Sequence, residues 1–276
     1  MKINIRMFCL LLCLSFSACS IEGDKYSADI VITNANIWTG NPDLSWAEAI
    51  AIKEDKILAV GSNLEIETQI GTETLVIDAE GKMITPGFID THVHFLGGGF
   101  NLLSIKLRDA ATPEEFINRF VEYTKSVPAG SWIQGGTWDH ELWGGTLPER
   151  SWIDSVTQDH PVAVSRLDGH MILANSKALE LAGISNEVKD IDGGTIVRTA
   201  EGEVSGIFKD NAMGLIYSQI PEKTEEEKMV AMKTAMQYMA SNGVTTLHDV
   251  GNGLWPNLDI YRKMEQDGEM LTRIYK

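Results

Sequence analysis

The chain has 276 residues, of which 43% are hydrophobic and 22% are charged, the composition of an ordinary globular protein with one large domain or two smaller ones. Its formal net charge of −16 argues against a nucleic-acid partner, because phosphate binding requires a basic face. We interpret the acidic surface as a solvated one.

The first 18 residues have the layout of a secretory signal. Two basic residues precede an apolar run over residues 7–14, and small residues then lead to Cys19. The run is too short to span a bilayer, which takes about 20 residues. Phe16-Ser17-Ala18-Cys19 resembles a bacterial lipobox with Phe where Leu is usual. We predict an exported protein, lipid-anchored through Cys19 to a bacterial membrane and facing the periplasm or the cell exterior; the alternative is a cytoplasmic protein with an apolar N-terminal helix.

Residues 19–27 form a polar tether, and residues 28–85 are expected to form a small β domain. β-branched runs separated by turns indicate short strands at residues 29–33, 35–39, 48–53, 56–60 and 74–78. Glu54 and Asp55, between two apolar alternations, are typical of a hairpin turn.

The rest of the chain alternates strands and helices. Residues 87–91 are apolar with little alternation, which is typical of a strand buried on both faces. The glycine triplet at residues 97–99 indicates a break in regular structure. Further strands are expected at residues 132–137, 162–166, 195–198, 203–208, 243–247 and 271–275, and helices at 112–125, 175–181, 222–241 and 257–266. This alternation predicts a parallel α/β architecture.

His92 and His94 follow the apolar strand at residues 87–91. Residues i and i+2 of a strand point to the same side, so the two imidazoles can converge on one metal ion. Imidazole suits zinc, iron, nickel or copper, and a catalytic zinc keeps a position open for water or substrate. His-x-His alone is weak evidence, but catalytic residues of a barrel project from such strand ends.

Four segments resemble the amidohydrolase superfamily. The run Ile84-Thr85-Pro86-Gly87-Phe88-Ile89-Asp90-Thr91-His92-Val93-His94 is similar to the first barrel strand of that superfamily. Arg166-Leu167-Asp168-Gly169-His170, Asn175-Ser176-Lys177-Ala178-Leu179 and Gly206-Ile207-Phe208-Lys209-Asp210-Asn211-Ala212 resemble its YtcJ-like branch, amidohydrolase family 3. The resemblance covers nearly all of residues 28–276.

The resemblance implies a fold and a chemistry. The fold would be an incomplete TIM-type (β/α)8 barrel over residues 86–276, preceded by a small β-sandwich domain at 28–85 and interrupted by a large insertion at about 97–241. The chemistry would be hydrolysis of a carbon–nitrogen bond other than a peptide bond, in a small amide-like substrate, by a metal-activated water. The expected cofactor is a divalent metal, zinc first, as one or two ions held partly by His92 and His94.

The resemblance also implies ligands that have no matching position here. Residues 87–276 are fewer than the roughly 250 of a complete barrel, so the further metal ligands and the catalytic acid/base are expected beyond Lys276. Lys209 is rejected as the family's carboxylated lysine, because it follows Phe208 in the insertion and not a fourth barrel strand. We expect a truncated N-terminal part that is poorly soluble and inactive alone.

Five residues are candidates for substrate binding. Trp138, Asp139 and His140 follow a strand and could line a pocket; alternatively, the tryptophan packs and the polar pair caps a turn. His170 matches the branch pattern, with a hydrogen-bonded structural histidine as the alternative. His248 ends a barrel-type strand and is a pocket candidate, not a metal ligand. His160, in a polar loop, is interpreted as a surface residue.

Several alternatives stay open at the level of sequence. Tryptophans at residues 132, 138, 143 and 152 fit either an aromatic pocket or core packing. The protein could instead be a non-catalytic lipoprotein that binds a ligand or partner, or a superfamily hydrolase of a lactone or other ester, because fold does not fix substrate. Self-association into a homo-oligomer is also left open.

Overall fold

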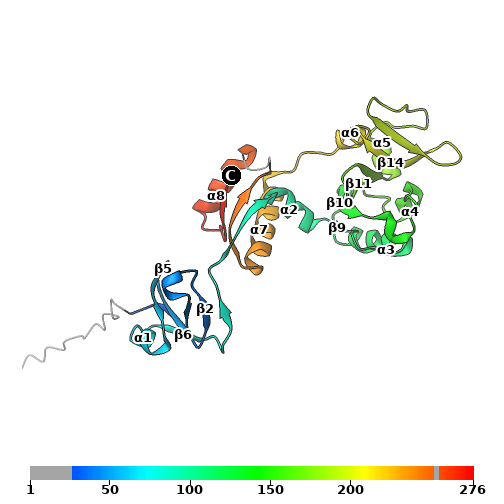
Figure 1. Ribbon diagram of the computed structural model, residues 1–276. Helices are drawn as coiled ribbons and strands as arrows, with labels where there is room; N and C mark the ends of the chain where they lie inside the picture. The colour runs from blue at the N-terminus through cyan, green and yellow to red at the C-terminus, as the bar shows by residue number, and fades with distance from the viewer. Residues whose placement is uncertain (1–26, 252–254) are drawn as a thin grey trace, which may run out of the picture. The chain divides into compact units, whose positions relative to one another are not determined.

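The computed structural model describes residues 27–251 and 255–276 of the chain (Figure 1). The predicted signal at residues 1–18, with Cys19 and nearly all of the tether, lies outside the described residues. The chain divides into two compact units, Met1–Pro86 and Gly87–Lys276. In the described ranges, no helix combines the length and hydrophobicity needed to cross a membrane.

The first unit is built from two small sheets. One has the order β5-β4-β1-β6, and the other the order β3-β2-β7. The strands are β1 (Ile30–Thr33), β2 (Asn36–Trp38), β3 (Trp46–Ala47), β4 (Ala49–Lys53), β5 (Lys56–Gly61), β6 (Leu75–Asp78) and β7 (Met83–Ile84). All five predicted strands are present. The sequence analysis missed the short strands β3 and β7, the 3-10 turn Pro42–Leu44 and helix α1 (Asn63–Glu67). Helix α1 begins with a capping box formed by Ser62 and Glu65.

In the second unit, a three-stranded parallel sheet has the order β16-β15-β8. Its strands are β8 (Phe88–Val93), β15 (Val244–Asp249) and β16 (Arg273–Tyr275), and helices α2 (Phe95–Leu103), α7 (Glu225–Ser241) and α8 (Leu258–Gln266) accompany them (Figure 1). The helices share one apolar core with the sheet, in which Met232, Met236 and Leu247 are almost fully buried.

Two expectations about this sheet were wrong. The side chains of Phe88 and Ile89 are 60% and 62% exposed, so strand β8 is not buried on both faces within this chain. The glycine triplet does not break structure either, since helix α2 runs through it. A Cβ at Gly99 would collide with the backbone carbonyl of Ala231. Glycine therefore lets α2 approach α7 closely.

A six-stranded sheet lies between α2 and α7 in the sequence, with the order β13-β14-β12-β11-β10-β9. Its strands are β9 (Ile105–Lys106), β10 (Ile133–Trp138), β11 (Val162–Arg166), β12 (Met171–Ala174), β13 (Gly194–Arg198) and β14 (Val204–Asp210). Strands β9, β10 and β11 are parallel and the others pair antiparallel, so this sheet is mixed. We call residues 104–224 the inserted region, because α2 and α7 belong to the core of the parallel sheet.

The inserted region has helices on its sheet and a closed core. The helices are α3 (Pro113–Thr124), α4 (Arg150–Ile153), α5 (Ser176–Leu181) and α6 (Met213–Tyr217). Phe116 and Phe120 of α3 pack on Ile133 and Val164 of the sheet with no exposed area. Thr112 caps α3 through the N–H of Glu115, as the sequence predicted.

Candidate metal site

His92 and His94 lie where strand β8 ends and helix α2 begins. His92 is in the strand and His94 is the residue before the first turn of the helix. Both side chains are exposed, and their ring centroids lie 5.8 Å apart. This separation is compatible with two imidazoles that bind one ion, since zinc–nitrogen bonds measure about 2.0–2.1 Å.

An opening of about 620 Å³ lies beside the pair. Asp90, Asn101 and Tyr238 line it together with the two histidines. The Asp90 carboxylate accepts the backbone N–H of His92 at 3.1 Å, which fixes the backbone at the end of the strand.

The described residues provide only part of the ligand set of a metal site. Over residues 27–251 and 255–276, no three His, Cys, Asp or Glu side chains gather in a group that could hold a metal ion. A catalytic zinc has three protein ligands and an open position. His92 and His94 could supply two of them.

Asp249, at the end of strand β15, holds the turn that carries His94. Its side chain is only 1% exposed. Oδ1 accepts the N–H of Phe95 at 3.2 Å and the N–H of Gly251 at 2.9 Å. A Cβ at Gly251 would lie 2.9 Å from Oδ1 and 3.4 Å from Nδ1 of His94. Asp249 therefore joins the turn after His94 to the neighbouring strand.

The other oxygen of Asp249, Oδ2, is buried without a hydrogen bond within the described part of the chain. The Tyr261 hydroxyl is likewise buried and unpaired there. Burial first, and then the charge of Asp249, raise the pKa of Tyr261 well above its usual value. The Asp249 carboxylate binds the backbone that follows another strand, a contact that no spacing within β15 reveals.

His248 lies at the same end of the parallel sheet as the histidine pair. Strand β15 pairs with β8 in parallel, with Leu247 opposite Asp90. The His248 side chain is exposed, and its ring lies 5.8 Å from that of Tyr275. Its role at a substrate pocket stays a prediction.

Trp138, Asp139 and His140 are structural in this fold. Trp138 is fully buried, and its indole N–H donates to the carbonyl of Val164 at 3.0 Å, so it has no surface with which to contact a ligand. His140 is nearly buried and accepts a hydrogen bond from Arg166. Asp139 caps the 3-10 turn His140–Trp143 through the N–H of Glu141. Trp138 is thus a packed tryptophan and its pocket assignment is corrected, while Asp139 caps a turn as the alternative stated. A role of Asp139 and His140 in substrate binding stays a prediction.

His170 and His160 differ from each other and from the histidine pair. His170 is exposed, and its Nδ1 lies 3.0 Å from the Asp210 carboxylate. His160 was expected at the surface but is 5% exposed, with Nδ1 placed 3.2 Å from the carbonyl of Ser131. A buried Asn175 explains this position, because its Nδ2 donates to the carbonyl of His160. Neither histidine belongs to the opening beside His92 and His94.

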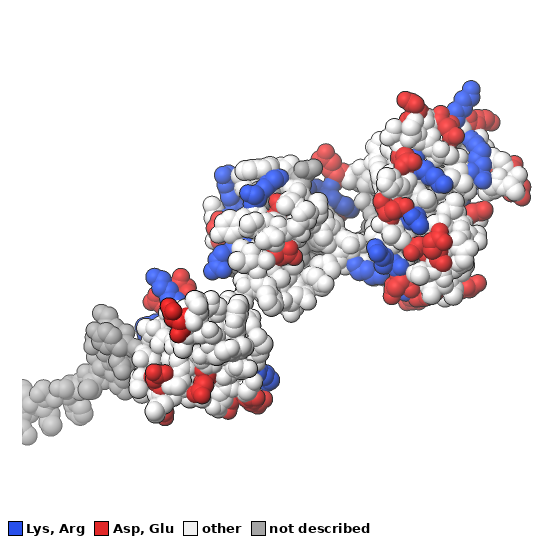
Figure 2. Space-filling model, viewed as in Figure 1, with Lys and Arg blue, Asp and Glu red and all other residues white. Residues whose placement is uncertain are grey.

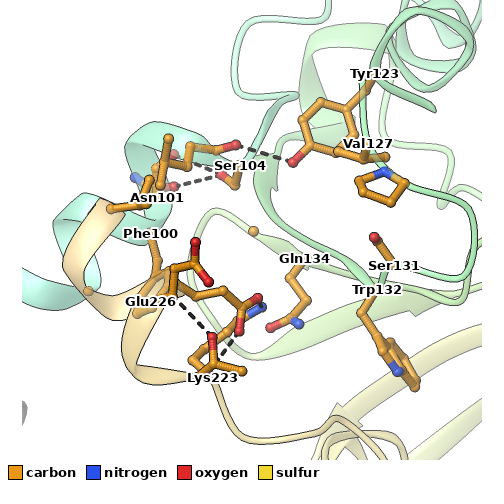
Figure 3. Close-up of a pocket in the computed structure, with 17 residues that line it drawn as sticks. Phe100, Asn101, Ser104, Tyr123, Val127, Ser131, Trp132, Gln134, Lys223 and Glu226 are labelled. Carbon is orange, nitrogen blue, oxygen red and sulfur yellow. Dashed lines mark hydrogen bonds and ion pairs between the residues drawn. The ribbon is translucent and has the colours of Figure 1, made fainter. Parts of the chain in front are cut away.

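The other tryptophans divide between the two readings. Trp143 and Trp152 pack against the core of the inserted region, with ring centroids 6.5 Å apart. Trp132 packs against a second buried cluster of the inserted region and also borders a cavity beside helices α2 and α7 (Figure 3). Core packing therefore accounts for most of the aromatic cluster.

Comparison with solved structures defines the class of fold. An uncharacterized metal-dependent hydrolase from Pyrococcus horikoshii superposes with a TM-score of 0.63 over 89% of this chain and 47% of its own, at 24% identity. The likeness is one of fold, an α/β fold of the metal-dependent hydrolase type.

The sequence comparisons then give the family. The model of the Amidohydrolase family called Amidohydro_3 matches residues 75–275, and the chain belongs to this family. Protein LONG AFTER FAR-RED 3 of Arabidopsis thaliana is 40% identical over 89% of this chain and 44% of its own length. Putative amidohydrolase YtcJ of Bacillus subtilis is 30% identical over 73% of this chain and 38% of its own. The chain thus spans less than half the length of these curated relatives.

Proposed function

We propose that the chain is the N-terminal part of a metal-dependent hydrolase that cleaves a carbon–nitrogen bond, other than a peptide bond, in a small amide-like molecule. The observation that carries the proposal is the histidine pair at the end of β8, with ring centroids 5.8 Å apart, in a member of the amidohydrolase family. An exposed pair at a parallel-strand end is where such a fold places its chemistry.

His92 and His94 would hold a divalent metal, with zinc the expected ion. Such an ion polarises a substrate carbonyl and lowers the pKa of a bound water. Asp249 positions the backbone that follows His94, through the N–H of Phe95. His248, exposed on the adjacent strand, would contact the substrate beside the metal.

The finer fold belongs to the same proposal. Strands β8, β15 and β16 would be the first three of a (β/α)8 barrel, after a small β sandwich. The exposed side chains of Phe88, Ile89 and Tyr275 would then pack on the remaining strands, which would supply the other metal ligands and the acid/base. On this account the 276 residues alone hydrolyse no amide.

The predicted secretory signal and lipid anchor are part of the proposal as well. Lipidation at Cys19 would hold the protein on a bacterial membrane. Incorporation of labelled palmitate that is lost in Cys19→Ala would support this proposal, and incorporation that survives in Cys19→Ala would contradict it. On the face drawn in Figure 2, Lys and Arg side chains are interspersed with Asp and Glu. A small-molecule substrate and no nucleic-acid partner remain part of the proposal, because nucleic-acid binding requires a basic face.

The test is hydrolysis by the full-length gene product against a panel of small amides, with lactones as the competing substrates. The double variant His92→Ala, His94→Ala should lose about a thousandfold in kcat/KM, which corresponds to roughly 4 kcal/mol. Asn118→Ala, an exposed position on α3, is the matched control. Ligand binding with no turnover of any panel member would favour the non-catalytic lipoprotein, and turnover of lactones alone would favour an esterase.

A further inference from the structure

The loop that follows strand β15 lies beside the second histidine of the pair. A Cβ placed on Gly251 would lie 3.4 Å from Nδ1 and 3.5 Å from Cα of His94, and these are distances of direct packing. Gly251 is buried. Its backbone therefore forms one wall of the space that the His94 imidazole occupies, and the position of that backbone restricts the orientations open to the ring.

Three hydrogen bonds hold this loop in place. The N–H of Val250 donates to the carbonyl of Val93 at 2.9 Å, and the N–H of Gly251 donates to Oδ1 of Asp249 at 2.9 Å. The third bond comes from another strand, because Nζ of Lys276 donates to the carbonyl of Gly251 at 2.9 Å. Both backbone polar groups of Gly251 are thus bound by side chains, and these side chains belong to different parts of the parallel sheet.

Strand β16 and an aromatic ring place the ammonium group of Lys276. Lys276 comes directly after β16, and Ile274 of that strand packs against the apolar core that the sheet shares with its helices. Side chains two residues apart in an extended chain point the same way, so Lys276 is directed to the helix side of the sheet. Its Nζ also lies 5.8 Å from the centre of the Trp255 ring, within the range of a cation–π contact.

The Asp249 carboxylate extends these contacts to the turn that carries His94. Its Oδ1 accepts the N–H of Gly251 and, at 3.2 Å, the N–H of Phe95. Asp249 and Phe95 are each only 1% exposed, so water competes little for these bonds. Hydrogen bonds therefore run without a break from the end of β16, through the loop after β15, to the residue after His94.

We propose that Lys276 is a positioning residue of the metal site, which holds the carbonyl of Gly251 and thereby fixes the loop that packs on His94. This inference rests on the proposed metal-dependent function and adds a third strand to the support of the histidine pair. Groups that hydrogen-bond directly to a metal ligand commonly change metal affinity about 10–100-fold when they are removed. Lys276 acts through a backbone neighbour of the ligand, so we expect a smaller effect.

Zinc titration of the whole chain and of three variants tests the role of Lys276. Lys276→Met keeps the apolar stem and removes the donor, so the affinity for Zn²⁺ should fall about threefold to fivefold. Lys276→Arg should restore the affinity, because a guanidinium group also donates to a carbonyl and stacks on an aromatic ring. Lys263→Met, at an exposed position on α8, is the matched control and should leave the affinity unchanged.

Backbone hydrogen exchange in the absence of metal gives a second readout. The N–H groups of Gly251 and Phe95 are both bound to Asp249, and they exchange faster when the loop opens locally. In Lys276→Met we expect the exchange of the Gly251 N–H to accelerate about tenfold. The N–H of Leu173, in the inserted sheet, should keep its rate. A residue that only stabilised the whole fold would accelerate both groups.

The outcomes separate the role of Lys276 from the assignment of the metal ligands. Weaker zinc binding in Lys276→Met that Lys276→Arg restores, together with faster exchange confined to the loop, supports the proposal. An unchanged zinc affinity or an unchanged exchange rate of Gly251 in Lys276→Met overturns it, while a loss of zinc in His92→Ala, His94→Ala would leave the metal site standing. Equal zinc binding by the unaltered chain and that double variant would instead overturn the metal site, and the positioning role with it.

Discussion

The inserted sheet and the parallel sheet of the second unit bury their apolar side chains to different extents. Ile133, Val164 and Leu173 of the inserted sheet have no exposed area, whereas Phe88 and Ile89 of the parallel sheet keep about three-fifths of theirs. Apolar surface left in water forgoes roughly 25 cal/mol per Å². The inserted sheet thus has a closed core, whereas the parallel sheet leaves apolar side chains exposed on the face where we propose that further barrel strands pack.

The largest effect is expected in the inserted core. Trp138→Ala removes a fully buried indole and leaves the carbonyl of Val164 without its donor. We expect a loss of about 3–5 kcal/mol in the free energy of unfolding, measured by urea denaturation. Trp255→Ala, at a side chain 64% exposed beside the parallel sheet, should cost far less. Similar losses for the two variants would remove the contrast between the sheets.

Asp249→Ala should produce the next largest loss. The substitution frees the N–H groups of Phe95 and Gly251, and two hydrogen bonds to a buried carboxylate correspond to about 2–3 kcal/mol. Asp267→Ala, exposed after α8, should change stability by less than about 0.5 kcal/mol. Metal uptake should also weaken in Asp249→Ala while the fold persists in circular dichroism. Unchanged uptake would mean that Asp249 does not position His94.

The capping box of α7 should contribute about 1 kcal/mol. Thr224 accepts the N–H of Glu227, and Glu227 accepts the N–H of Thr224 at 2.8 Å. That backbone hydrogen bond outweighs the opposing effect of burial and holds the pKa of Glu227 below its usual range. A lowered folded-state pKa stabilises the protein above the unfolded-state pKa, and this stability is lost as pH falls through the lowered value. The thermal midpoint of Glu227→Gln should therefore converge with that of the unaltered chain between pH 7 and about pH 3. Thr224→Ala, which loses the hydroxyl that accepts the N–H of Glu227, should stay less stable over the whole range.

The smallest effect on stability is expected at the open face. Ile89→Lys places a charge where the side chain is 62% exposed, so the free energy of unfolding should change by less than about 0.5 kcal/mol. Solubility, measured by light scattering against concentration, should rise because an exposed apolar patch is interrupted. A large destabilisation would show that this face is covered in solution, and would bring the two sheets closer together in character.

Features that depend on local pattern were predictable from sequence. The helix at Pro113–Thr124, with its Thr112 cap, and the strand that leads into the histidine pair follow from periodicity and capping chemistry. The triplet around Gly99 was misread, because the reason for glycine there is the backbone of Ala231, more than a hundred residues away in the chain.

The candidate site was predictable only in part for the same reason. The histidine pair could be found from sequence because the two residues stand at positions i and i+2. The hydrogen bond from the N–H of Phe95 to Asp249 could not, because it joins the ends of two different strands. Trp138 and Asn175 matched patterns of interest, yet their hydrogen bonds reach Val164 and Thr157 within a closed core. A motif identifies residue types, and burial decides whether those residues can contact a ligand.

Zinc binding by the whole chain tests the central claim most directly. Zn²⁺ is titrated into three proteins: the unaltered chain, the double variant His92→Ala, His94→Ala, and the control His170→Ala. The control changes an exposed histidine outside the pair. The account predicts that the double variant loses at least about tenfold in affinity and that the control retains it. Equal zinc binding in all three proteins would contradict the assignment of His92 and His94 as metal ligands.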